Sequence, residues 1–80
     1  MNISSILVTT SQTHFESTVV ALTTIEGLQV HYLDEDSSRI IVTQEAENVS
    51  QEMEGLQRIK SLPHVVMAEM VMHVCEEETT

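Results

Sequence analysis

The sequence predicts an α+β fold in which a strand–helix–strand unit occurs twice. Residues 3–33 have the pattern of strand, helix and strand, and residues 39–74 repeat that order. A polar run at residues 34–38 separates the two halves and is typical of a hairpin turn between neighbouring strands. The chain has 80 residues, enough for one domain. We expect that domain to span residues 1–75 and residues 76–80 to form an acidic flexible tail.

The first half opens with a β-branched, apolar segment at residues 3–10, which has the length of a strand. Thr13 and Glu16 have the spacing of a capping box, so we expect a helix to begin at Thr13. Gly27 is expected to end this helix, because glycine is favoured at left-handed positions after a helix. The apolar stripe at helical spacing consists of Phe15, Val19, Leu22 and Ile25.

The middle of the chain predicts a hairpin followed by a second helix. Residues 28–33 alternate, which places Leu28, Val30 and Tyr32 on one face, and residues 39–43 form the returning strand. Asn48 is expected to cap the second helix, and Pro63 to stop it. The apolar positions that keep helical spacing in it are Val49, Met53, Leu56 and Ile59. Gly55 weakens this helix by about 1 kcal/mol relative to alanine.

Residues 65–75 alternate as a long strand with two different faces. The uniform face is apolar and is expected to meet the helices; it consists of Val66, Ala68, Met70, Met72 and Val74. The mixed face is expected to see solvent or a partner; it consists of Val65, Met67, Glu69, Val71, His73 and Cys75.

Two right-handed βαβ crossovers joined by a hairpin define a ferredoxin-like plait, βαββαβ, with a four-stranded antiparallel sheet and both helices on one face. The opposite sheet surface would then be free to bind a partner. It is predicted to carry Ser5, Leu7, Thr9, Arg39, Ile41, Thr43, Met67, Glu69, Val71 and His73.

The charge of the chain limits its partners. Thirteen acidic residues face three basic ones, so the formal net charge is −10. Such a chain repels nucleic-acid phosphates and anionic membrane surfaces and attracts basic ligands. Cys75 is the single cysteine, and no apolar stretch has the length of a membrane span. We expect a cytoplasmic protein that binds no nucleic acid and inserts into no membrane.

The side chains that could carry chemistry do not form a recognisable centre. The sulfur and imidazole groups near the C-terminal end suggest a soft-metal site; they are Met67, Met70, Met72, His73 and Cys75. The alternation of the strand divides them between opposite faces, so methionine packing in the core is the simpler interpretation. No nucleophile is evident beside any of the four histidines. We predict no catalytic residue, no metal and no cofactor.

At this point the chain resembles the NapD family. The resemblance is carried by residues 5–8, residues 27–30, residues 40–47 with Glu45-Ala46-Glu47, and residues 65–73 followed by an acid-rich tail. Two positions depart from the family pattern, which usually has proline where Glu26 stands and glycine where His64 stands. The resemblance implies a small cytoplasmic chaperone for maturation of the periplasmic nitrate reductase. Such chaperones bind the twin-arginine signal peptide of the catalytic subunit and delay its export until the molybdenum cofactor is inserted.

The predicted function is therefore signal-peptide binding without catalysis, by a monomer or weak dimer. A basic head and an apolar body suit a −10 protein with an aliphatic sheet surface. The predicted peptide-binding residues are Ser5, Leu7, Thr9, Ile41, Met67, Glu69, Val71 and His73. The alternatives are a regulatory plait that senses a small molecule and, less favoured, a soft-metal chaperone.

Overall fold

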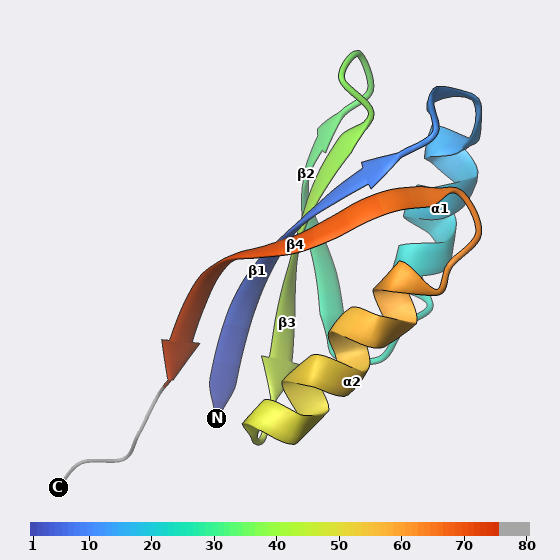
Figure 1. Ribbon diagram of the computed structural model, residues 1–80. Helices are drawn as coiled ribbons and strands as arrows, with labels where there is room; N and C mark the ends of the chain where they lie inside the picture. Colours follow the sequence, from blue (N-terminus) through green and yellow to red (C-terminus); the bar gives the residue numbers. More distant parts are fainter. Residues whose placement is uncertain (76–80) are drawn as a thin grey trace, which may run out of the picture.

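A computed structural model of the protein describes residues 1–75 (Figure 1), and the predicted tail at residues 76–80 lies outside the described residues. The elements are β1 (Asn2–Thr10), a short 3₁₀ turn η1 (Gln12–His14), α1 (Phe15–Thr23), β2 (Leu28–Asp34), β3 (Arg39–Ala46), α2 (Val49–Lys60) and β4 (Val65–Cys75). The strands form one antiparallel sheet in the order β2-β3-β1-β4. Both helices cover the same side of that sheet, so the predicted ferredoxin-like βαββαβ architecture is confirmed (Figure 1).

The two central strands, β1 and β3, alternate without interruption. On β1 the even-numbered residues from Asn2 to Thr10 are buried, and the odd-numbered residues are half-buried. β3 pairs with β1 in a continuous register, in which Ile6 lies opposite Val42 and Leu7 opposite Ile41. The core beneath the helices is aliphatic, with one aromatic ring; its buried members are Ile6, Val8, Phe15, Leu22, Ile40, Val42, Leu56, Ile59 and Ala68.

The edge strand β4 contains two irregularities that change which residues face the helices. Thr10 pairs with Val65 and Thr9 with Met67, so Val66 is an extra residue, and it is 71% exposed. Ile6 pairs with Met70 and Ser5 with Met72, so Val71 is also extra. The alternation predicted from the sequence assigns the faces correctly only from Met67 to Met70. Its prediction that Val66 and Met72 meet the helices is wrong, because each bulge shifts the side-chain pattern by one residue.

The other edge strand, β2, is also bulged. Val30 pairs with Val42, but Tyr32 pairs with Ile41, and His31 is the additional residue between them. Tyr32 therefore lies on the surface away from the helices and is 55% exposed. The prediction that Tyr32 shares a face with Leu28 and Val30 is wrong for the same reason.

Helix α1 begins later and ends earlier than the sequence suggests. Its first residue is Phe15, and no side chain caps its amino end. The Thr13 hydroxyl lies 3.0 Å from His14 Nδ1 and accepts from no backbone N–H, so the predicted capping box is wrong. The helix ends at Thr23, and Gly27 takes its left-handed conformation, φ 85°, directly before β2.

Helix α2 is capped as predicted, with Asn48 Oδ1 accepting from the Gln51 N–H at 2.9 Å. Its buried face differs from the predicted stripe. Val49 and Met53 are exposed, at 58% and 48%, and Leu56 and Ile59 are buried. The buried face consists of Glu52, Gly55, Leu56 and Ile59, which also follow helical spacing.

Gly55 allows α2 to approach β3 closely. A β-carbon on Gly55 would lie 1.7 Å from the Gln44 amide oxygen, so no larger residue fits without moving that amide. Gln44 is buried, and its Nε2 donates to the Glu52 carbonyl at 3.1 Å. The glycine that weakens the isolated helix therefore makes room for a buried hydrogen bond between helix and sheet.

His64 stands where the family usually has glycine, and the backbone conformation at this position accounts for that preference. Its φ is 73°, in the left-handed region where glycine is the least strained residue. The His64 ring stacks on His14 with 3.5 Å between ring centroids. The His64 carbonyl accepts from the Ser11 N–H at 2.9 Å, which ties the start of β4 to the end of β1.

Candidate functional site

The sheet surface that neither helix covers is called the open face here. Across its centre Leu7 pairs with Ile41 on one side and with Glu69 on the other. From the strand register, its members are Ile3, Ser5, Leu7, Thr9, Gln29, Tyr32, Asp34, Arg39, Ile41, Thr43, Glu45, Met67, Glu69 and Met72. Six predicted peptide-binding residues therefore lie together on this face: Ser5, Leu7, Thr9, Ile41, Met67 and Glu69.

The open face is apolar along two of its borders. Met67 and Met72 on β4 are 47% and 60% exposed, and Tyr32 on β2 is 55% exposed. Met72 and Tyr32 were missed from the sequence because they follow bulges, which leave no signal in an alternating pattern. Val71, another predicted binding residue, is the extra residue of its bulge and is 53% exposed.

His73 is not on the open face, and its predicted placement there is wrong. It pairs with Ser4, whose side chain is buried beneath α2. His73 Nε2 lies 2.9 Å from Oε1 of Glu52, a residue of α2 that is 2% exposed. The bulge at Val71 turns His73 inward, where it contacts a carboxylate that burial would otherwise penalise.

Ser4, His73 and Glu52 are the residue types of a hydrolase triad, but their geometry differs from one. The Ser4 Oγ is sealed from solvent and has no hydrogen-bond partner, so it is not joined to His73. A triad needs an accessible nucleophile hydrogen-bonded to its base. This group of residues therefore holds α2 against the sheet and offers no attacking oxygen.

The thioethers and imidazole of β4 do not converge in the structure. Met67 and Met72 belong to the open face, whereas Met70 and His73 pair with residues on the helix-covered face. The predicted separation of soft ligands is present, with Met72 and His73 on the sides opposite to those expected. Within residues 1–75, no three His, Cys, Asp or Glu side chains are grouped as metal ligands would be.

A second candidate surface is a cleft of about 470 Å³ between α2 and the ends of β2 and β3. Its walls carry four carboxylates, from Glu26, Glu45, Glu47 and Glu54. Arg58 also lines it and forms no ion pair with any carboxylate of residues 1–75. The remaining lining residues are Met1, Gly27, Gln44, Ala46, Gln51 and Gly55. We call this the acidic cleft.

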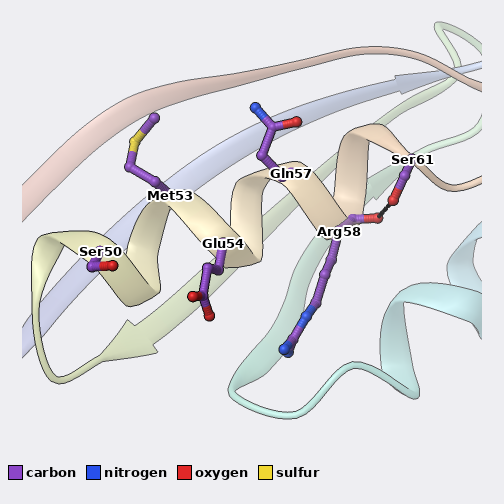
Figure 2. Close-up of a pocket in the computed structure, with 6 residues that line it drawn as sticks. All are labelled: Ser50, Met53, Glu54, Gln57, Arg58 and Ser61. Atoms are coloured by element: carbon purple, nitrogen blue, oxygen red, sulfur yellow. Dashed lines mark hydrogen bonds between the residues drawn. The ribbon is translucent and has the colours of Figure 1, made fainter.

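The outer surface of α2 is a shallow, open depression (Figure 2). Met53 and Gln57 project to one side of the helix, whereas Glu54 and Arg58 project to the other side (Figure 2). The Ser61 hydroxyl donates to the Arg58 carbonyl at 2.9 Å and closes the last turn. Because Glu54 and Arg58 also line the acidic cleft, this side of α2 is shared between the two surfaces.

One carboxyl of the open face, that of Asp34, has a shifted pKa. The pKa of Asp34 lies below its ordinary value of 3.8, chiefly because the Ser37 side chain hydrogen-bonds to it. The Ser37 N–H, 3.4 Å from Asp34 Oδ1, and the Arg39 charge lower that pKa further. The turn between β2 and β3 thus stabilises a negative charge beside Arg39.

Two comparisons with known proteins point to the same family. The family described as NapD protein matches residues 1–77. Among solved structures, the fold is similar to the solution structure of the E. coli Tat proofreading chaperone protein NapD, with a TM-score of 0.84 and 22% identity. That match covers 98% of this chain and 82% of the other. No curated protein sequence matches the chain. No helix within residues 1–75 is long and apolar enough to cross a membrane.

Proposed function

Because the chain belongs to the NapD family, we propose that it is a chaperone that binds a twin-arginine signal peptide on its open face. The peptide is that of the catalytic subunit of the periplasmic nitrate reductase. In this proposal, binding occurs in the cytoplasm, delays export until the molybdenum cofactor is inserted, and involves no catalysis. The similar E. coli structure is described as a Tat proofreading chaperone, which supports this assignment.

The observation that carries the proposal is the uncovered sheet surface with its exposed apolar side chains. Met67, Met72 and Tyr32 surround the half-buried Leu7 and Ile41. An apolar segment placed there would remove these side chains from water, a gross contribution of about 25 cal/mol per Å² of apolar area that offsets the entropy cost of association. Methionines suit a binding surface for variable apolar partners, because the thioether chain is flexible and polarisable.

The charge of the chain supports a basic ligand. A net charge of −10 attracts an arginine-containing segment over distances near the Debye length, about 8–10 Å at physiological salt. This attraction accelerates association and is screened by salt, whereas apolar contacts limit dissociation. We expect added salt to slow association much more than it speeds dissociation.

The test uses a synthetic peptide with an arginine pair ahead of an apolar segment, titrated into the ¹⁵N-labelled protein. We expect amide shifts at Leu7, Ile41, Met67 and Met72, and weaker binding of a peptide with two lysines, since lysine lacks the planar fork of arginine. Shifts confined to α1 and α2 would contradict the open-face site. Binding of a free amino acid in place of the peptide would favour the small-molecule-sensing alternative.

A further inference from the structure

We infer that the acidic cleft is the subsite for a guanidinium group, so that the arginine head and the apolar body of the peptide occupy different surfaces. This inference rests on the proposed function and adds to it a location for the basic head. The open face is poorly suited to two arginines. Of its three carboxylates, Asp34 lies opposite Arg39 and Glu45 also lines the acidic cleft, which leaves Glu69 on β4, and Arg39 already places a positive charge on this face.

The carboxylates of the cleft come from three parts of the fold. Glu26 precedes β2, Glu45 and Glu47 lie at the end of β3, and Glu54 is on α2. No His, Lys or Arg of residues 1–75 forms an ion pair with any of these four carboxylates. The cleft therefore presents charged acceptors that no described side-chain cation occupies.

An independent observation at the cleft also indicates a hydrogen-bond donor as ligand. Gln44 is 4% exposed, and its Nε2 donates to the Glu52 carbonyl. That bond fixes the orientation of the amide, so its oxygen lies beside Gly55 at the wall of the cleft. This oxygen accepts no hydrogen bond from a residue within 1–75. The Ser4 Oγ is sealed from solvent, whereas this Gln44 oxygen is not.

A guanidinium matches this arrangement better than an ammonium. It is planar and has five N–H donors, so one group can contact a neutral oxygen at the floor and carboxylates on the walls together. Arg58 and Met1 with its amino group line the same cleft, and a ligand would have to displace or avoid these two cations. The partner group is thus an arginine side chain of the bound peptide.

The cleft and the open face meet at Glu45. By register, Glu45 pairs with Ile3 and alternates with Thr43 and Ile41, so it belongs to the side of the sheet away from the helices. Glu45 also lines the cleft, near the carboxyl end of β3. A peptide can therefore run from the cleft around the end of β3 and onto the open face without crossing a helix.

The experiment measures peptide affinity by calorimetry for wild-type protein and two charge-matched variants. Glu26→Gln with Glu54→Gln alters the cleft, and Glu16→Gln with Glu35→Gln removes two exposed carboxylates elsewhere. We expect the cleft variant to bind the arginine peptide about tenfold more weakly than the control variant does. Thermal unfolding of both variants checks that each remains folded.

A second peptide, with both arginines replaced by glutamine, completes a double-mutant cycle. The cleft variant and the control variant should bind this peptide equally, because the interaction under test is then absent. Arg58→Gln should tighten binding of the arginine peptide by about two- to fivefold, since it removes a competing cation.

The possible results distinguish a failure of the proposed function from a failure of the cleft assignment. If the arginine peptide does not bind wild-type protein, the proposed function is wrong, and this inference with it. If the peptide binds on the open face but the cleft and control variants weaken it equally, the proposed function stands and the cleft assignment is overturned. A loss confined to the cleft variant and to the arginine peptide supports the assignment.

Discussion

The central and edge strands of this sheet differ in the regularity of their pairing. β1 and β3 each hydrogen-bond on both sides, and their side chains alternate from end to end. β2 and β4 each pair on one side only, and both contain bulges. A strand with one free side can accommodate an extra residue without displacing a second neighbour. The bulges place Tyr32 and Met72 on the open face and turn His73 toward Glu52 of α2, so the edges determine the character of the candidate site.

The largest expected effect compares a central with an edge position. Ile6 on β1 is fully buried, so Ile6→Ala should lower the free energy of unfolding by about 2–5 kcal/mol. Val66, the extra residue at the start of β4, is 71% exposed, so Val66→Ala should change it by no more than about 0.5 kcal/mol. Urea denaturation of both variants measures the difference. Similar losses would show that Val66 is packed in the core and that the first bulge is misplaced.

The sequence was sufficient for the architecture because that architecture depends on the central strands. The faces predicted for residues 5–9, for residues 39–43 and for the stretch from Met67 to Met70 are those of the structure. A bulge shifts the pattern by a single residue and has no compositional mark here, so Met72, Tyr32 and His73 were assigned to the wrong faces. For α2, the predicted and the buried stripes share Leu56 and Ile59, but the buried one includes Glu52, whose carboxylate contacts His73, and apolar spacing gives no sign of that contact.

The second prediction tests the bulge at Val71. His73→Ala removes the partner of the buried Glu52 carboxylate and should cost about 1–3 kcal/mol, since a buried acceptor loses a hydrogen bond. Met72→Ala, at a side chain that is 60% exposed, should cost no more than about 0.5 kcal/mol. Continuous alternation would give the reverse order. Chemical denaturation of both variants decides between the two registers.

The third prediction concerns how β4 begins. His64 has φ 73°, so His64→Gly should be more stable than His64→Ala by about 1 kcal/mol; both variants lose the stacking on His14. Thr24, with φ −86°, provides the control, because Thr24→Gly should be less stable than Thr24→Ala. Differential scanning calorimetry of the four variants measures both differences. If alanine is preferred at both positions, the left-handed conformation of His64 is not the native one.

The smallest expected effect is a pH dependence at the turn that joins edge strand β2 to central strand β3. The pKa of Asp34 is lowered in the folded state, so its charged form stabilises the fold above the unfolded value of 3.8. That stabilisation should be lost as the pH falls from about 3.8 through the lower folded pKa. Ser37→Ala removes the largest cause of the shift and should flatten the pH dependence of the unfolding midpoint in this range. Asp34→Asn should flatten it further, because no charge remains. An unchanged slope in Asp34→Asn would show that the charge of Asp34 contributes nothing to stability in this pH range.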